Sequence, residues 1–289
     1  MAISYELRAR VALEKYGFHN TYSLGQNFIF NEDLLSGLLM AAGVGKGDKV
    51  LEIGPGAGIM TSILAERCEK VVSIEIDQKL KPVLDEMLSD KDNSTIVYAD
   101  AMKSDIGAII RDELGGGEVR VVANLPYYIT SDVLMRLVAG GYGITDVCVM
   151  VQKEAADRLM SKKGDKQWCA VAAVMSYYGK VEIIDDVPRS CFEPAPHVDS
   201  AFMRISLYDE KPVQAISDDM MKKVINSAFR MRRKTLVNNL TGDFAISRQQ
   251  AEEMLTGLGL DTRVRGEALE LEQLAQVADA IYNLKETNA

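Results

Sequence analysis

The stretch that most constrains the fold is residues 50–58, where an apolar run ends in three glycines at alternate positions, the first of them Gly54. Apolar residues then recur at helical spacing over 59–64. This pattern predicts a buried parallel strand, a tight turn and a helix N-terminus. Glycines let a ligand approach the backbone closely, and the free N–H groups of a helix start suit an electron-rich ligand.

A second apolar run ends in Glu75, 21 positions after Gly54, where a carboxylate can accept hydrogen bonds from ribose hydroxyls. A nicotinamide or flavin site would need glycine at position 59, which is Ile59. The spacing found, with Glu52 before it and Gly56 within it, instead resembles the S-adenosylmethionine loop of class I methyltransferases. We therefore predict S-adenosyl-L-methionine as a cofactor, and a purely structural turn is the alternative.

Strand and helix patterns alternate along most of the chain, as in βαβ units. Strands are expected at 49–53, 71–76, 95–98, 119–123 and 146–151, with helices between them at 59–67, 78–89, 104–113 and 130–139. Strands 180–184 and 200–207 are expected to complete the sheet as an antiparallel edge pair. The sequence predicts an α/β fold of the class I, Rossmann-like type, with a mostly parallel sheet and the ligand at the carboxyl ends of its strands.

The character of the chain changes after Tyr208, where a linker precedes helical patterns alone. Helices are expected at 217–233, 247–256 and 270–285, in addition to N-terminal helices at 4–16 and 31–42. We predict a cofactor-binding catalytic domain over residues 1–208 and a small all-α domain over residues 209–289.

The composition, with 47% hydrophobic and 26% charged residues, is ordinary for a soluble globular protein. No apolar stretch has the length of a membrane span, and Met1 to Tyr22 lacks the apolar segment of a signal peptide. Four scattered cysteines and two histidines offer little material for a zinc site or a histidine triad. We expect a cytoplasmic protein with reduced thiols, no metal site and no membrane partner.

Two more predicted strands end in polar residues at the sheet edge that holds Gly54. Asp100 follows the third strand, where it can accept a hydrogen bond from the exocyclic amine of adenine, and a turn aspartate is the alternative. The fourth strand ends in Asn124-Leu125-Pro126-Tyr127. This Asn-x-Pro-Tyr sequence resembles the motif of amino-methyltransferases that act on adenine N6.

An exocyclic amine is a poor nucleophile because its lone pair is delocalised into the ring. If the Asn124 side-chain oxygen and the Leu125 carbonyl accept its two hydrogens, the nitrogen moves toward tetrahedral geometry and its lone pair faces the sulfonium methyl. Tyr127 offers a ring for stacking the base. We predict catalytic roles for these three residues, and the alternative is a strand-ending turn with core tyrosines.

Phe192 precedes Pro194 and Pro196, which stiffen an extended loop. We predict that Phe192 forms the wall of a base slot opposite Tyr127, where stacking contributes about 1–3 kcal/mol per base. The alternative is a core side chain beside prolines at a sheet edge.

Three motifs in this order resemble the KsgA (RsmA) family of rRNA adenine N6,N6-dimethyltransferases. They are Leu24-Gly25-Gln26-Asn27-Phe28-Ile29, Asn124-Leu125-Pro126-Tyr127 and Phe192-x-Pro194-x-Pro196-x-Val198-Asp199, and the likeness continues through Arg232-Arg233-Lys234-Thr235-Leu236. The resemblance implies cofactor contacts at Asn27, Ile29, Gly54, Glu75, Asp100 and Asn124, to which the glycine turn adds Gly56.

The same resemblance implies dimethylation of two adjacent adenosines in the 3′-terminal hairpin of 16S rRNA, with the immature small ribosomal subunit as partner and the enzyme as a monomer. The chain departs from the family pattern at Thr21 and Tyr22, where relatives often carry basic residues, and at Ile29, which is more often Leu.

The net charge is −9, yet one segment, from Lys222 to Lys234, holds six basic residues and no acidic one. At about 100° per residue, five of them fall within an arc of about 120°. These are Lys222, Lys223, Arg230, Arg233 and Lys234. A helix that is cationic on one face grips phosphates, so we predict RNA binding here, and a solvated face is the alternative.

Two other functions stay open on the sequence alone. One is an Erm-type enzyme that methylates adenine in 23S rRNA, against which the C-terminal helices and their Arg-Arg-Lys-Thr-Leu segment argue. The other is an assembly or transcription factor that keeps the fold without turnover, against which the intact cofactor and Asn124 motifs argue.

Overall fold

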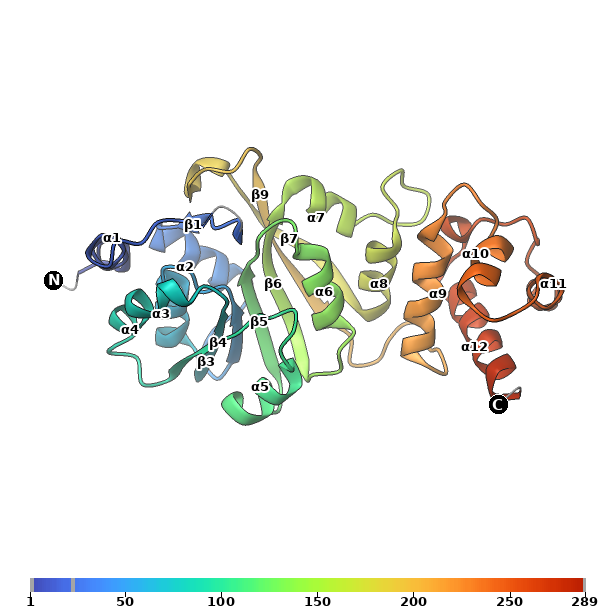
Figure 1. Cartoon of the computed structure of the whole chain (residues 1–289), viewed down its shortest axis with the longest axis horizontal. Coiled ribbons are helices and arrows are strands. Elements are labelled where there is room, and N and C mark those ends of the chain that lie inside the picture. Colours follow the sequence, from blue (N-terminus) through green and yellow to red (C-terminus); the bar gives the residue numbers. More distant parts are fainter. Residues whose placement is uncertain (1–2, 22–23, 288–289) are drawn as a thin grey trace. The chain divides into compact units, whose positions relative to one another are not determined.

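A seven-stranded sheet lies at the centre of the first part of the chain (Figure 1). The computed structural model describes residues 3–21 and 24–287. The strands are β2 (Lys49–Ile53), β3 (Lys70–Glu75), β4 (Ser94–Tyr98), β5 (Val119–Asn124), β6 (Ile144–Gln152), β7 (Gly179–Val187) and β9 (Ser200–Leu207). Their order is β4-β3-β2-β5-β6-β9-β7, with β4 to β6 parallel and β9 antiparallel to β6. This confirms the predicted mixed sheet.

The strand order reverses direction between β2 and β5, since the chain runs from β2 outward to β3 and later from β5 outward to β6. Right-handed crossovers then place the connecting helices α3 (Ile59–Arg67) and α6 (Thr130–Val138) on opposite faces of the sheet. Ligands of such sheets bind beyond the carboxyl ends of the strands at this switch point. The fold therefore places a binding site beside Gly54 and Asn124.

The remaining helices of this part are α1 (Tyr5–Lys15), α2 (Glu32–Ala41), α4 (Lys81–Met87), α5 (Ile106–Leu114) and α7 (Lys153–Leu159). The predicted N-cap Asn31 is confirmed, because its side chain accepts a hydrogen bond from the Leu34 N–H at 2.9 Å. The helix predicted over 78–89 is divided into a 3-10 turn (Gln78–Leu80) and α4. Pro82 lies in the first turn of α4, where a backbone nitrogen has no hydrogen-bond partner within the helix, so proline is tolerated there.

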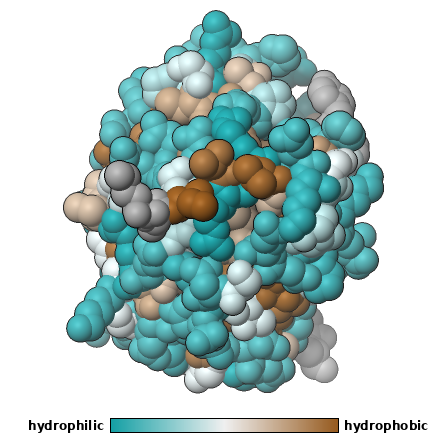
Figure 2. Space-filling view, turned by 90° about the vertical axis from the view of Figure 1, so that its left-hand side faces the viewer, coloured by the Kyte–Doolittle hydropathy of each residue, from teal (hydrophilic) through white to brown (hydrophobic). Residues whose placement is uncertain are grey.

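Helix α1 faces the core with small alanines and faces the solvent with larger apolar side chains. Ala9 and Ala12 are buried in the core that α1 shares with α2, α3 and α4, whereas Ile3, Leu7 and Val11 are exposed at four-residue spacing. Figure 2, which faces the left-hand side of Figure 1, shows hydrophobic residues in a row among hydrophilic ones. Small inward residues let α1 pack closely without a large apolar face of its own.

A second, two-stranded sheet joins β1 (Phe28–Ile29) to β8 (Phe192–Glu193), with Ile29 opposite Phe192. The sequence does not predict this pair, because two-residue strands carry no periodicity and their pairing is distant in sequence. Arg10 of α1 holds β8 in place, since its guanidinium donates to both carboxylate oxygens of Glu193 at 2.9 and 2.6 Å.

The described chain forms two compact units, the first made of Met1–Ala156 with Lys180–Leu207 and the second of Asp157–Gly179 with Tyr208–Ala289. The second unit contains α8 (Ala170–Tyr178), α9 (Asp218–Arg230), α10 (Leu236–Asp243), α11 (Arg248–Gly257) and α12 (Leu271–Thr287). Residues 157–179, expected from the sequence in the first domain, belong to the second unit. In the structure α8 packs on α9, and the Trp168 ring meets Phe229 edge-on at 5.7 Å.

The helix predicted over 217–233 ends earlier, at Arg230. A turn follows, in which the Lys234 N–H donates to the Met231 carbonyl, and Thr235 then caps the unpredicted helix α10. Arg233 and Lys234 lie in this turn, so the prediction of one helical arc for all five cations is wrong. The described helices include none that is long and apolar enough to cross a membrane.

Candidate active site

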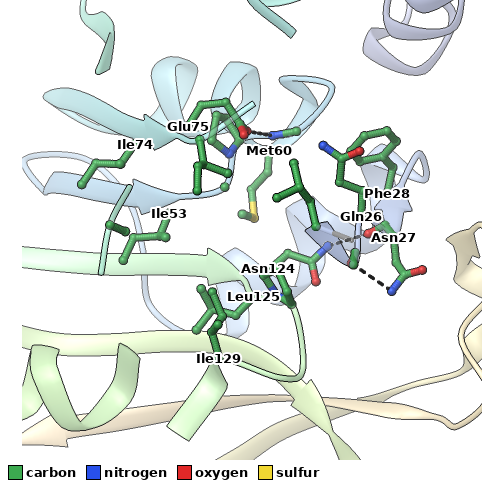
Figure 3. Close-up of a pocket in the computed structure, with 18 of the residues that line it drawn as sticks. Gln26, Asn27, Phe28, Ile53, Met60, Ile74, Glu75, Asn124, Leu125 and Ile129 are labelled. Carbon is green, nitrogen blue, oxygen red and sulfur yellow. Dashed lines mark hydrogen bonds between the residues drawn. The ribbon is translucent and has the colours of Figure 1, made fainter. Parts of the chain in front are cut away.

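A cavity of about 300 Å³ lies at the carboxyl ends of β2, β3, β4 and β5 (Figure 3), within the size range of small-molecule sites. It is lined by residues 24–29, the glycine turn, the end of β3, the loop after β4 and the loop after β5, together with Leu35 of α2 and the first residues of α3. The lining includes most of the predicted site residues, namely Asn27, Ile29, Gly54, Gly56, Glu75, Asp100, Asn124, Leu125 and Tyr127. Phe192 is not among the lining residues.

The glycine turn is possible only without side chains. Gly54, Gly56 and Gly58 all have positive φ angles, at 76°, 55° and 81°, which L side chains rarely adopt. A Cβ at Gly56 would also lie 2.8 Å from the ring of Phe28. The turn therefore brings bare backbone against the cavity while β1 closes over it.

Glu75 is held at the cavity by backbone donors. Its side chain is buried, the residue being 4% exposed, and its two oxygens accept from the Asp77 N–H at 2.7 Å and the Gly56 N–H at 3.3 Å. Burial raises the pKa of this carboxyl above its usual value. A carboxylate has about four acceptor positions, so a fixed Glu75 retains capacity for two further donors from a ligand.

Asn124 at the end of β5 is oriented by the N-terminal segment. Its side-chain nitrogen donates to the Asn27 carbonyl at 2.9 Å, which leaves the side-chain oxygen as an acceptor for a ligand (Figure 3). Asn27 is itself fixed, because its amide donates to the Gly25 carbonyl at 3.3 Å. The geometry thus presents a hydrogen-bond acceptor beside the cavity in one orientation.

Two tyrosines follow Asn124 at the mouth of the cavity. Tyr127 is half-buried and shares a hydrogen bond of 2.7 Å with the hydroxyl of Ser200, which fixes its ring. Tyr128 also lines the cavity and is 65% exposed, with its ring 3.4 Å from the position of a Cβ on Gly25. An exposed aromatic ring at a cavity mouth is available for stacking.

The structure corrects the expectation that Phe192 forms a wall of a base slot. Phe192 is 2% exposed and belongs to the hydrophobic core that includes Ile29, its partner in the short sheet. The Arg10–Glu193 contact beside it holds β8 against α1. Phe192 therefore supports Ile29 from the core instead of facing the cavity, as the alternative interpretation expected.

Gln26 and Asp77 form an anchor that the sequence analysis missed. The Gln26 side chain accepts from the Thr21 N–H at 2.8 Å and donates to Asp77 at 3.0 Å, and the Thr21 hydroxyl also donates to Asp77. An acidic residue two positions after Glu75 was the available signal. Tyr22, the other departure from the family pattern, lies outside the described residues.

Asp100 lines the cavity from the loop after β4. One of its oxygens accepts from the Met102 N–H at 2.9 Å, and the exposed Lys103 pairs with the carboxylate at 3.3 Å. The backbone contact is that of a turn aspartate, yet the side chain still faces the cavity. The turn-aspartate interpretation is therefore observed, and the contact with an adenine amine stays a prediction.

Residues 17–282 match the model of a family described as ribosomal RNA adenine dimethylase. The chain belongs to the ribosomal RNA adenine dimethylase family. It is 41% identical to the Ribosomal RNA small subunit methyltransferase A of Lachnoclostridium phytofermentans, over 93% of this chain and 94% of the relative. The protein of the same name from Clostridioides difficile is 38% identical over 93% of each chain.

Solved structures show the same fold. A dimethyladenosine transferase from Plasmodium falciparum is similar with a TM-score of 0.70 and 22% identity, over 89% of this chain and 97% of that one. The 23S rRNA methyltransferase ErmE is similar with a TM-score of 0.62 and 24% identity, over 89% and 100%. As a member of its family, the chain is an S-adenosyl-L-methionine-dependent rRNA adenine dimethyltransferase.

The residues present fit this cofactor. A Cβ at Gly56 would fill the cradle beside Phe28, and the buried Glu75 carboxylate faces the same space with acceptor capacity left for hydroxyl groups. At the switch point of the sheet, the side-chain-free backbone of the glycine turn and the Glu75 carboxylate are therefore suited to the nucleoside cofactor that the glycine spacing predicts.

Glu52 is a fully buried carboxyl beneath the glycine turn. One oxygen accepts from the hydroxyls of Thr61 on α3, at 2.7 Å, and Ser73 on β3, at 2.6 Å, and the other has no partner among the described residues. Burial raises the pKa of Glu52 to about 7. In the folded protein the carboxyl is therefore protonated at pH values where it ionises in the unfolded chain.

We expect Glu52→Gln to abolish the decrease in the free energy of unfolding that the Glu52 carboxyl causes as the pH rises. As the pH rises from about 4.5 to about 7, the folded state holds a proton that the unfolded state has released, so wild-type stability falls by up to about 3 kcal/mol relative to the variant. Urea unfolding at about pH 5 and about pH 8 measures this, with the exposed Glu69→Gln as control. A difference between wild type and E52Q that does not change with pH would contradict the assignment.

Proposed function

We propose that the chain dimethylates the N6 amines of two adjacent adenosines in the 3′-terminal hairpin of 16S rRNA within the immature small ribosomal subunit. The observation that carries the proposal is the oriented Asn124 oxygen, which lies beside a cavity formed by the glycine turn and Glu75. Relatives at 38–41% identity named small subunit methyltransferase A support the choice of subunit.

We assign the cofactor by chemistry. Glu75 accepts from its ribose hydroxyls, Asp100 accepts from its adenine amine, and the backbone around Gly54 and Gly56 allows its close approach. Asn27 and Ile29 close the cavity from β1 and the segment before it. When bound, S-adenosyl-L-methionine supplies an electrophilic methyl group on its sulfonium.

The target amine is activated by the loop after β5. The Asn124 oxygen and the Leu125 carbonyl accept its two hydrogens, which directs the nitrogen lone pair toward the methyl group. Tyr127, fixed by Ser200, stacks on the adenine, and the exposed Tyr128 at the cavity mouth offers a second ring. No general base is needed, because the methylated ammonium loses its proton to water, and rate comes from placement.

The RNA-facing part is assigned to the second domain, residues 209–289, where Lys222, Lys223, Arg230, Arg233 and Lys234 contact phosphates. Lys223 pairs with Asp219 and Arg230 with Asp243, whereas Arg233 and Lys234 have no ion pair among the described residues. The unpaired cations in the turn before α10 are the ones most available to RNA. We further propose that the enzyme acts as a monomer in the cytoplasm, where small subunits assemble.

Transfer of tritium from labelled cofactor to unmethylated small subunits, with mapping of the labelled nucleotides, tests the proposal. Two dimethylated neighbouring adenosines near the 3′ end of 16S rRNA are the expected product. Label in large subunits instead would identify an Erm-type enzyme. Absence of label in both, with cofactor bound, would identify a non-catalytic assembly factor.

Glu75→Ala is expected to weaken cofactor binding by at least about 100-fold, because two hydrogen bonds to a charged group each contribute about 1.5–3 kcal/mol. The raised pKa of Glu75 also predicts that wild-type affinity falls on acidification at a pH above the usual carboxyl value. Titration calorimetry measures both effects, with the exposed Glu14→Ala as control. Wild-type affinity in a folded E75A would refute the ribose assignment.

Asn124→Ala is expected to keep cofactor and subunit binding within several-fold and to slow single-turnover methyl transfer by orders of magnitude, because its oxygen acts chiefly in the transition state. Asn124→Asp should be as slow, although it keeps an acceptor, because its carboxylate cannot donate to the Asn27 carbonyl. Rapid-quench measurement of one turnover decides. A near-normal rate in either variant would exclude the role.

Arg233→Gln with Lys234→Gln is expected to flatten the slope of log K against log salt by about 1.5 units for small-subunit binding, since each phosphate contact contributes about 0.7–0.9. Cofactor affinity should not change. The control is Lys46→Gln with Lys70→Gln, at the amino edge of the sheet. A double variant with the wild-type slope would show that the turn is only a solvated surface.

A further inference from the structure

A second cavity, of about 620 Å³, lies within the second compact unit, where residues of α8, α9, α10 and α12 and the residue after α10 line it. Three cations, Lys223, Arg230 and Lys285, face it together with one acidic residue, Asp243. Its net positive charge favours an anionic ligand. No predicted cofactor residue belongs to it.

Arg230 is held as a fixed, planar cation at this cavity. Its guanidinium donates to Asp243 at 2.6 Å, and a Cβ on Gly242 would lie 2.4 Å from one of its nitrogens. Glycine at 242 therefore leaves the space that the guanidinium occupies. The side chain remains 44% exposed, so one surface of the group is open to a ligand. A guanidinium fixed in this way can stack on a nucleobase.

Polar groups surround the guanidinium on the same side of α9. Lys223 and Asn226 precede Arg230 by seven and four residues, which places the three on one helical face. Ser227 also lines the cavity, and its buried hydroxyl has no hydrogen-bond partner among the described residues. Lys285 lies over the Phe244 ring at 5.2 Å. Two lysines thus line the cavity together with the planar Arg230 guanidinium, the exposed Asn226 amide and the unpaired Ser227 hydroxyl.

We propose that this cavity binds one unpaired nucleotide of the substrate rRNA. The base stacks on the Arg230 guanidinium with its edge toward Asn226 and Ser227, and the flanking phosphates pair with Lys223 and Lys285. The inference rests on the proposed function, because it takes rRNA as the ligand, and it assigns to the second unit a contact with a base in addition to contacts with the backbone.

The test separates base recognition from charge. Fluorescence anisotropy measures binding of the full chain to an adenine-free single-stranded RNA pentamer and to a fully abasic pentamer of the same charge. The wild type is expected to prefer the base-bearing pentamer about 10-fold, as one stacked base allows. Arg230→Lys, which keeps the charge and the Asp243 partner, should lose this preference while its affinity for the abasic pentamer stays unchanged.

Lys222→Met is the matched control, because Lys222 lies on the same helix and does not line the cavity. It should weaken binding of both pentamers by one factor and keep the preference. Asn226→Ala changes an exposed side chain and is expected to reduce the preference several-fold, so the proposal stays testable if R230K unfolds. A wild type without preference, or variants at Arg230 and Asn226 that retain it, would overturn the proposal.

A mononucleotide that competes as well as the pentamer would show a site for free nucleotides, which also overturns the rRNA assignment. Methyl transfer by the wild type to small subunits is measured separately. If the wild type transfers no methyl group to small subunits, the proposed function is refuted. The preference between the two pentamers alone tests nucleotide binding in the cavity, so the two failures are distinguishable.

Discussion

The site depends on a close approach between bare backbone and two other segments. Gly56 places its N–H against Glu75 and its Cα against the ring of Phe28, where any Cβ would collide. This contact joins the end of β2, the end of β3 and the short β1 around one cavity. Without positive φ at Gly54 and Gly56 the turn would not form. The Glu75 carboxylate and β1 would then not lie beside the same cavity.

The orientation of Asn124 is the second requirement. Its amide donates to the Asn27 carbonyl, so a segment near the N-terminus decides which atom of the β5 side chain faces the cavity. That segment is in turn anchored through Gln26 to Asp77, two residues beyond Glu75. Hydrogen bonds therefore fix both the Asn124 side of the cavity and the segment beside Asp77.

Sequence reasoning was right where a pattern is local. Alternating apolar runs gave the strands of the central sheet, and Asn31 capped its helix as predicted. The interpretation of Phe192 was wrong because a phenylalanine beside rigid prolines fits either a stacking wall or a core position. Only its pairing with Ile29, distant in sequence, decides for the core. The ion pair between Arg230 and Asp243 could not be predicted for the same reason, because Asp243 lies thirteen positions away on another helix.

The sequence by itself determined the strands and helices of the central sheet, the glycine turn, Glu75 and the Asn124 motif, because spacing and backbone constraints act over a few residues. The tertiary structure decided which side chains face the cavity, which cations are already paired, and that α9 stops at Arg230. Those outcomes depend on interactions between segments far apart in the chain, where burial and partner atoms, not local pattern, set the lower free energy.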